Sequence, residues 1–348
     1  MRKRSLTWLN LILTLVLLGT PLWAQTSTDT NNGNTRPRRA VVGGVNLSMD
    51  DVKSYERAIV YNQRLAVGAP YAFDSYYNVA SLYALLGQKR DALEWLRRAV
   101  DKGLVDDEMI SADTSLISLR DEPVFKQILT SIPEKAAKLP KIDKTIIEIV
   151  GPSGPTAKGP LPMLIALHGE TESAFGMIDI MRVIAERHSL VLVAPQGKYF
   201  IGDGHYQWGR RNEAEALVMQ AIEQAKGKYS IDPNRIYLMG FSQGGYLSLT
   251  LGLSHPEIFA GAIAFSGRYL HSLVTATLEK ARNRKFRVFI GNGERESPHI
   301  LNNNNEAKQL LEQAGLTVNL KIFAETGHAY PPNATQEIDE AVQWLIRQ

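Results

Sequence analysis

The sequence predicts an α/β protein in which helices cover both faces of a mostly parallel sheet, preceded by a small all-helical unit. From residue 139 to residue 348, short runs rich in β-branched residues alternate with segments of helical periodicity, which is typical of a parallel sheet. Between residues 47 and 138, apolar residues recur at helical spacing throughout. The length of 348 residues also exceeds what one hydrophobic core usually serves, so two folded units are expected.

The first 24 residues have the layout of an export signal. Three basic residues at positions 2–4 precede an apolar run over residues 6–18, and Ala24 closes the segment before a polar stretch. We expect cleavage after Ala24 and a periplasmic or secreted protein. The apolar run is shorter than the ~20 residues that span a bilayer, so no stable membrane span is expected, although an uncleaved anchor is the alternative. Residues 25–46 are polar and predict a flexible linker.

The composition indicates an ordinary globular protein, with 44% apolar and 22% charged residues. The formal net charge of +3 is fully accounted for by the three basic residues of the signal, so no nucleic-acid partner is expected. The chain contains no cysteine, which excludes disulfides and a lipid-attachment cysteine. Neither clustered metal ligands nor a phosphate-binding glycine loop is evident, so we expect no metal and no cofactor.

The segment from Asp74 to Gly103 is similar to a tetratricopeptide-type helical hairpin, in which Ala80, Ala92 and Ala99 allow two antiparallel helices to approach closely. Only one copy is evident, and such repeats normally need neighbours to bury a continuous core. Flanking helices, expected near residues 50–67 and 120–131, or the catalytic unit must therefore complete the packing. Two roles stay open for the helical unit: an extension without a ligand, or a binding site for a peptide or protein partner.

Within residues 139–348, alternating patterns predict both strands and helices. Strands are expected at residues 146–150, 163–167, 190–193, 236–239, 262–265, 288–290 and 318–323. Helices are expected at about 174–188, 212–229, 244–254, 272–282, 302–314 and 335–347. In such a sheet, functional sites gather at the carboxyl ends of the strands, and each candidate residue below follows a strand.

The segment Gly240-Phe241-Ser242-Gln243-Gly244-Gly245 joins an expected strand directly to a helical run. This strand–turn–helix context is the one that a nucleophile elbow requires, and glycines at 240 and 244 suit a turn too sharp for side chains. The turn places the Ser242 hydroxyl above the sheet and beside the N-terminus of the next helix, where developing negative charge is stabilised. We therefore predict that Ser242 is a nucleophile.

A serine hydroxyl needs a base to accept its proton, usually a histidine held by a carboxylate. Among the seven histidines, His328 follows the last expected strand and precedes the final helix, so it is the predicted base. The acid should follow the strand at 288–290, where the loop contains Glu294 and Glu296 but no aspartate. Either glutamate is a candidate, and a serine–histidine dyad is the alternative.

The oxyanion formed on serine attack needs two hydrogen-bond donors. We expect the backbone N–H of Gln243, directly after the nucleophile, and that of Glu170 in the loop after the strand at 163–167. The aromatic segment between residues 195 and 211 contains Tyr206 and Trp208, which are candidates for the wall of a substrate pocket. A packed loop with its aromatic rings turned inward is equally consistent with this segment.

Residues 141–348 resemble the phospholipase/carboxylesterase branch of the α/β hydrolases and the related depolymerase-like esterases. The resemblance rests on Leu167-His168-Gly169, the segment 240–245, His255-Pro256-Glu257, Phe259-Ala260-Gly261, Phe265-Ser266-Gly267 and Gly327-His328. It implies an α/β-hydrolase fold and cofactor-free hydrolysis of carboxylic esters or thioesters. The sequence departs from this branch in its glutamate in place of the usual aspartate and in its helical unit. The spacing of Glu296, three residues after Gly293, favours it over Glu294.

We therefore expect a serine hydrolase that cleaves a small-molecule carboxylic ester through an acyl-enzyme, with Ser242, His328 and Glu296 as its triad. Two alternatives stay open. One is a serine peptidase of the prolyl-oligopeptidase type, and the other is a catalytically silent protein with this fold that binds a partner. Because every candidate group lies in residues 139–348, this segment is expected to form an independent catalytic unit.

Overall fold

The computed structural model describes residues 39–42, 45–68, 73–153, 159–202, 204–269 and 275–347. The expected export signal at 1–24 and the first part of the expected linker lie outside the described residues. The last part of that linker contributes to a two-stranded antiparallel hairpin of β1 (Arg39–Val42) and β2 (Val45–Ser48). Within the described ranges, no helix combines the length and apolar character needed to cross a membrane.

The helical unit consists of α1 (Met49–Gly68), α2 (Phe73–Leu85), α3 (Lys89–Asp101), α4 (Asp107–Ala112), the 3-10 helix η1 (Thr114–Leu119) and α5 (Pro123–Lys138). Helices α2 and α3 form the expected hairpin, and the small residues Ala80, Ala92 and Ala99 are fully buried in it. Gly87 ends α2 with a φ of 68°, a backbone conformation that glycine adopts without strain. Apolar residues of α1 pack on α2, as the single repeat requires.

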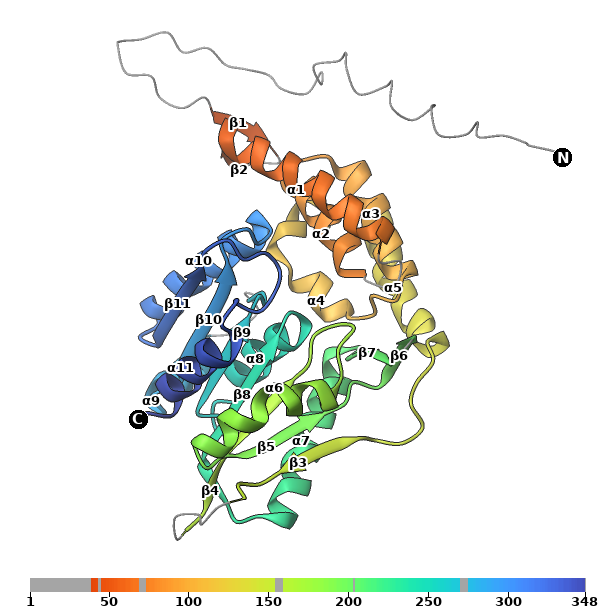
Figure 1. The fold of residues 1–348 in the computed structure, drawn as a ribbon. Coiled ribbons are helices and arrows are strands. Elements are labelled where there is room, and N and C mark those ends of the chain that lie inside the picture. Colours follow the sequence, from red (N-terminus) through yellow and green to blue (C-terminus); the bar gives the residue numbers. More distant parts are fainter. Residues whose placement is uncertain are drawn as a thin grey trace, which may run out of the picture.

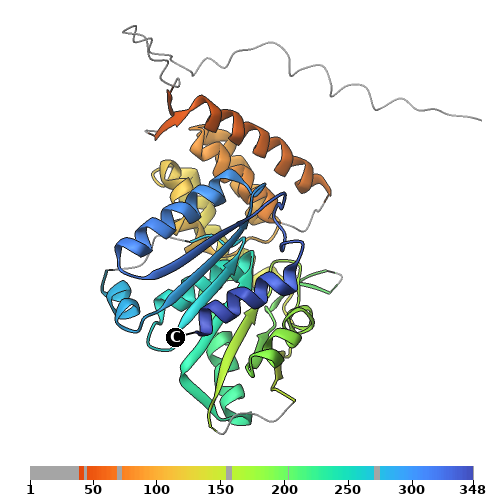
Figure 2. The same cartoon turned by 60° about the vertical axis from the view of Figure 1, so that its left-hand side comes forward.

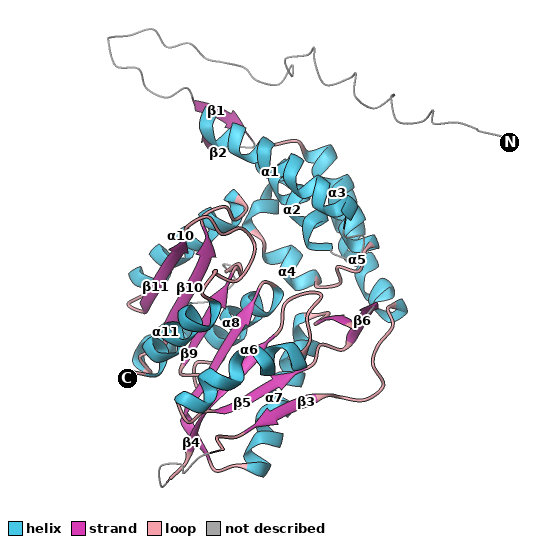
Figure 3. Cartoon of the chain, in the orientation of Figure 1, coloured by secondary structure: helices cyan, strands magenta, loops and turns pink. Residues whose placement is uncertain are grey.

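The segment expected to be the catalytic unit, residues 139–348, is built on one seven-stranded sheet with the order β11-β10-β9-β8-β4-β5-β3 (Figures 1 and 3). Its strands are β3 (Ile147–Val150), β4 (Leu161–Leu167), β5 (Val191–Pro195), β8 (Ile231–Phe241), β9 (Gly261–Phe265), β10 (Arg287–Gly293) and β11 (Thr317–Phe323). All neighbouring strands run parallel except β3, which pairs antiparallel with β5. A separate hairpin of β6 (Tyr199–Gly202) and β7 (His205–Gln207), which the sequence patterns do not indicate, follows β5.

Helices cover both faces of the sheet. The helices are α6 (Ala174–Arg187), α7 (Arg211–Lys228), α8 (Gln243–Ser254), α9 (Thr275–Asn283), α10 (Pro298–Gln313) and α11 (Ala334–Ile346). Helices α6 and α11 share one apolar core with the sheet, whereas α7, α8, α9 and α10 share the other. Burial on both faces explains why the central strands are continuous apolar runs rather than alternating ones. The expected α/β-hydrolase-like architecture is therefore confirmed.

The helical unit packs against the carboxyl ends of the strands (Figure 2), and its core is continuous with that of the catalytic unit. Apolar side chains of α2 to α5 belong to the same buried cluster as those of α7 and α8. The guanidinium of Arg268, which follows β9, lies 3.0 Å from the carboxylate of Asp113, which caps η1, and both side chains are largely buried. The catalytic unit thus completes the packing of the helical unit.

Candidate active site

Ser242 occupies a tight turn between β8, which ends at Phe241, and α8, which begins at Gln243. Its φ of 51° and ψ of −115° lie in a region that side-chain-bearing residues rarely adopt. A Cβ atom on Gly240 would lie 2.2 Å from the carbonyl oxygen of Gly244, so no side chain fits at position 240. The expected requirement for glycine at position 240 therefore has a direct steric cause. The turn presents the serine hydroxyl at the carboxyl ends of the strands.

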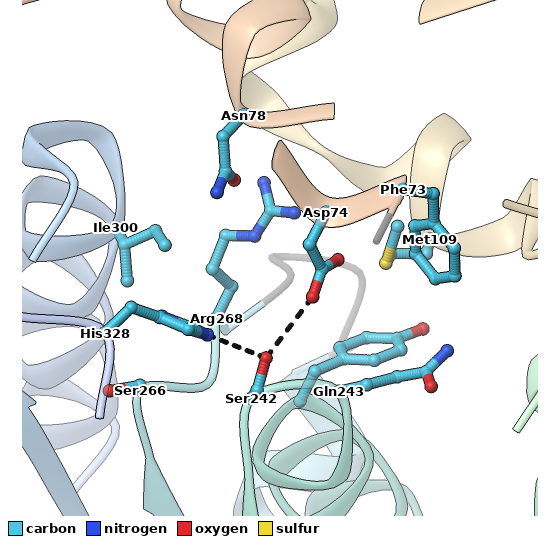
Figure 4. Close-up of a pocket in the computed structure, with 11 residues that line it drawn as sticks. Phe73, Asp74, Asn78, Met109, Ser242, Gln243, Ser266, Arg268, Ile300 and His328 are labelled. Carbon is cyan, nitrogen blue, oxygen red and sulfur yellow. Dashed lines mark hydrogen bonds between the residues drawn. The ribbon is translucent and has the colours of Figure 1, made fainter. Parts of the chain in front are cut away.

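His328 and Glu296 come from loops after β11 and β10 and meet Ser242 at these strand ends. The Nε2 atom of His328 lies 2.9 Å from Oγ of Ser242 (Figure 4), and its Nδ1 atom lies 2.8 Å from Oε2 of Glu296. Glu294 does not face the histidine; its carboxylate accepts a hydrogen bond from the backbone N–H of Glu325. The three side chains of Ser242, His328 and Glu296 therefore form one hydrogen-bonded chain.

The ionisation of this chain suits proton transfer from serine. Burial would lower the pKa of His328, but 35% of its side chain stays exposed, and the Glu296 carboxylate raises the pKa above the ordinary histidine value. Burial would raise the pKa of Glu296, yet His328 and the backbone N–H of Ser297 outweigh it, and the net pKa lies below the ordinary value. Glu296 therefore stays ionised and orients the imidazole, as a triad carboxylate must.

The predicted sources of the oxyanion donors are Gln243, at the N-terminus of α8, and Glu170, in the loop after β4. Gln243 is the first residue of α8 and lines the cavity at Ser242, while its side-chain Oε1 accepts the backbone N–H of Trp208 at 3.2 Å. Glu170 is buried, and its carboxyl accepts the backbone N–H of Phe73 at 3.0 Å. Burial, and after it the neighbouring Asp74, raise the pKa of the Glu170 carboxyl well above its ordinary value.

The helical unit contributes side chains to this site that the sequence patterns do not indicate. The carboxylate of Asp74 lies 3.3 Å from Oγ of Ser242, and Phe73, Asn78 and Met109 also line the cavity around the serine (Figure 4). Asp74 lies in the first turn of α2, so a favourable charge at a helix N-terminus would explain it fully from sequence. No feature of the sequence connects it with Ser242.

Comparison with known proteins places the chain in a family. The model of the family described as phospholipase/carboxylesterase matches residues 146–346, which is more than half of the chain. The chain belongs to this family. A tetratricopeptide repeat model matches residues 73–101, in agreement with the expected helical hairpin.

Proteins similar to this chain include depolymerases and esterases. Poly(3-hydroxyalkanoate) depolymerase C of Paucimonas lemoignei is 31% identical over 124 residues, 33% of this chain and 30% of that protein. Acyl-protein thioesterase 1 of Gibberella zeae is 31% identical over 134 residues, 38% of this chain and 54% of that protein. A solved phospholipase/carboxylesterase from Dyadobacter fermentans aligns with a TM-score of 0.44 at 20% identity, covering 57% of this chain and 97% of that one. The chain thus spans between about a third and a half of these two curated relatives' length.

In this member of the phospholipase/carboxylesterase family, Trp208 and Tyr206 do not line the cavities that reach Ser242 or His328. Trp208 is buried; its ring stacks on that of His168 at 4.7 Å, and its indole N–H donates to the carbonyl oxygen of His168 at 2.8 Å. The carbonyl oxygen of Tyr206 accepts the N–H of Thr171. Of the two interpretations left open for this segment, the buried position of Trp208 agrees with the packed loop, and the backbone of Tyr206 contacts the loop that contains Glu170.

Across the described ranges, no group of three or more histidine, aspartate or glutamate side chains is arranged to hold a metal ion.

Proposed function

We propose that this protein is an exported serine esterase, in which Ser242 is the nucleophile, His328 the base and Glu296 the acid that orients it. The observation that carries the proposal is the unbroken hydrogen-bonded chain from Glu296 through His328 to Ser242. It stands at the carboxyl edge of a parallel sheet, where this architecture gathers its reactive groups. Membership of the phospholipase/carboxylesterase family supports ester hydrolysis as the reaction.

In the acylation step, Oγ of Ser242 attacks the carbonyl carbon of the ester while Nε2 of His328 accepts the hydroxyl proton. The carbonyl oxygen becomes an oxyanion, and the backbone N–H groups of Gln243 and Glu170 are proposed to donate hydrogen bonds to it. Collapse of this intermediate breaks the bond to the alcohol oxygen. His328 gives its proton to that oxygen, so a neutral alcohol leaves and an acyl-serine remains.

Deacylation repeats these steps with water in place of the serine. His328 accepts a proton from the attacking water, the second oxyanion collapses, and Oγ of Ser242 leaves with the proton returned by the histidine. The products are a carboxylic acid, an alcohol and the free enzyme. Ionised Glu296 stabilises the imidazolium that forms in each half of the reaction.

The cellular location of the protein is proposed from its N-terminal sequence. Residues 1–24 have the layout of an export signal, so the mature protein is proposed to be periplasmic or secreted. A small-molecule acyl ester is its proposed substrate, and a peptide or protein partner for the helical unit remains a prediction.

The proposal is tested by comparing the turnover of p-nitrophenyl acetate with that of p-nitroacetanilide and of a peptidyl p-nitroanilide. An esterase turns over the ester and leaves the anilide, whereas a peptidase of the prolyl-oligopeptidase type cleaves a peptidyl anilide. Treatment with a fluorophosphonate that carries small substituents provides the control, since it reacts with an activated serine whatever the preferred substrate. Failure to react with both the ester and the fluorophosphonate would reject the proposal and favour a catalytically silent binding protein.

A further inference from the structure

The helical unit forms one wall of the cavity that Ser242 lines. Phe73 and Asp74 at the start of α2 and Met109 of α4 line this cavity together with Ser242 (Figure 4). Phe73 is 1% exposed and Met109 is 7% exposed, so both side chains are held by packing rather than free to swing away. The wall opposite the catalytic serine is therefore a fixed part of the helical unit.

The cavity at Ser242 is small. Its volume is about 30 Å³. Since one water molecule needs roughly 10–15 Å³ of such space, only about two or three atoms of the size of an oxygen or a methyl carbon fit in it. A carbonyl oxygen and a methyl or ethyl group fill such a space, whereas a fatty acyl chain does not enter it.

A much larger groove adjoins this cavity. Its volume is about 610 Å³, within the range of ~300–1,000 Å³ that is typical of ligand sites. The groove runs between α1 and the segment from Glu294 to Asn302, and it shares Asp74, Asn78 and His328 with the small cavity. The two spaces therefore meet at the histidine.

The lining of the groove is polar and of mixed charge. The half-buried Asn78 and the exposed Asn302 provide amide groups, Arg57 provides a cation, and the ring of Tyr61, which is 57% exposed, forms part of the wall. Amides combined with an exposed aromatic ring suit a polyhydroxylated molecule, because hydroxyl groups exchange hydrogen bonds with the amides while the carbon face of a sugar covers the ring.

The chemistry of acyl transfer assigns each space to one half of an ester. The acyl carbon bonds to Oγ of Ser242, so the acyl group must occupy the cavity that Ser242 lines. The leaving oxygen receives its proton from Nε2 of His328, which lines both spaces, so the alcohol can extend from the histidine into the groove, which has room for it.

We propose that the helical unit makes this enzyme selective for esters that join a two- or three-carbon acid to a large polyhydroxylated alcohol such as a glycoside. This inference rests on the proposed function and specifies its substrate class. Phe73 and Met109 exclude longer acyl groups, and the groove along α1 holds the sugar. The selectivity belongs to the helical unit, because three of the elements that form these walls, α1, α2 and α4, lie in it.

The acyl half is tested by kcat/KM for p-nitrophenyl acetate, propionate, butyrate and octanoate with the full chain. We expect a fall of about tenfold or more from propionate to butyrate, since one methylene group against a closed wall has an effect of this size. Met109→Ala should raise the ratio of butyrate to acetate turnover by about tenfold. Ile110→Ala is the matched control, because Ile110 is buried on the same helix but does not line the cavity, and it should leave the ratio unchanged.

Because the ratio compares two substrates on the same molecules, a loss of folded protein does not change it. Met109→Leu, which preserves side-chain volume, should retain the wild-type ratio. Octanoate turnover at least equal to that of acetate in the wild-type enzyme, or equal ratios in Met109→Ala and Ile110→Ala, would overturn the assignment of the acyl cavity.

The alcohol half is tested by acetate release from an acetylated oligosaccharide and from a peptide that contains O-acetylserine. We expect preference for the oligosaccharide, and a larger rise of its KM than of the KM for p-nitrophenyl acetate in Tyr61→Ala. Val67→Ala, a change at an 85% exposed position of α1 outside the groove, should leave both values unchanged. Preference for the peptide, or for a methyl ester of a bulky polar acid, would overturn the assignment of the groove.

Reaction with the fluorophosphonate separates failure of this inference from failure of the proposed function. An enzyme that is labelled and prefers long acyl chains retains the proposed function and refutes the short-acyl selectivity. An enzyme that is not labelled and cleaves no ester refutes both.

Discussion

The carboxylate of Asp74 lies 3.3 Å from Oγ of Ser242, although 168 residues separate the two in the chain. Asp74 lies in the first turn of α2 in the helical unit, and Ser242 precedes α8 in the catalytic unit. This contact places the helical unit directly beside the Ser242 hydroxyl. A second contact between the two units lies next to it, where the backbone N–H of Phe73 donates a hydrogen bond to the carboxyl of Glu170. The helical unit therefore shapes the site in addition to extending the fold.

Ser242→Ala should preserve the fold and lower kcat for a small acetate ester by about four to six orders of magnitude, because the members of such a triad act as a unit. The position tolerates alanine as it tolerates serine, since the backbone strain at φ 51° is the same for both. Circular dichroism checks the fold and steady-state kinetics the activity. Retention of more than a tenth of wild-type turnover would remove Ser242 from its proposed role.

Glu296→Gln should keep the fold and slow the reaction by a factor on the order of 10⁴, since glutamine stabilises the wrong tautomer of His328 and leaves the imidazolium unpaired. Glu294→Gln is the matched control, because Glu294 lies in the same loop but contacts only the backbone of Glu325. We expect Glu294→Gln to retain near wild-type kcat. A reversed outcome would transfer the acid role to Glu294, and two silent variants would indicate a serine–histidine dyad.

Activity should rise with pH through a midpoint above ~6.5, the ordinary histidine value. Only neutral His328 can accept the serine proton, and Glu296 stabilises the protonated ring, so more alkaline solution is needed to remove that proton. The measurement is kcat/KM for p-nitrophenyl acetate from pH 5 to pH 9. A flat profile, or a midpoint well below the ordinary value, would contradict this arrangement.

Asp74→Asn should move this midpoint to lower pH. Asp74 adds to the negative potential that raises the pKa of His328, although less strongly than Glu296 does, so removing its charge favours the neutral ring. Asp51→Asn, at another carboxylate that lines the groove but has no such effect on the histidine, is the control. An unchanged midpoint in Asp74→Asn would argue that the helical unit does not lie over the serine in solution.

Asp113→Asn should destabilise the protein by about 3–5 kcal/mol, because it leaves the buried guanidinium of Arg268 without its counter-ion. The change keeps the shape of the side chain and its ability to cap η1, so the loss reports the ion pair. Denaturant unfolding measures the free energy. As a control, Glu134→Ala breaks an exposed ion pair with Lys138 and should have no measurable effect on the free energy of unfolding. Equal stability of the wild-type protein and both variants would show that the pair of Asp113 and Arg268 does not join the two units.

Much of the fold could be predicted from sequence because the central strands contain apolar runs that alternate with helical segments. The nucleophile turn was recognisable for a similar local reason: the glycines at 240 and 244 are required by backbone contacts of 2.2 Å and 2.0 Å that any Cβ would make. The spacing from Gly293 placed Glu296 rather than Glu294 in the loop position that faces His328, as the geometry has it.

The part of the site that the helical unit contributes could not be predicted, because Asp74, Phe73 and Met109 come close to Ser242 only through the packing of one unit on the other. Their sequence environment is that of an ordinary helical hairpin. Trp208 shows a related limit: the sequence left a pocket wall and a packed loop equally open, and only the structure shows its indole buried against His168. Aromatic composition does not reveal which side of a loop a ring will face.

Mass spectrometry after treatment with the small fluorophosphonate shows whether Ser242 is an activated nucleophile within a working triad. We predict a single covalent adduct on the peptide that contains Ser242, no adduct in Ser242→Ala, and strongly slowed labelling in Glu296→Gln. The absence of an adduct on the wild-type protein, or an adduct that persists in Ser242→Ala, would contradict this role of Ser242.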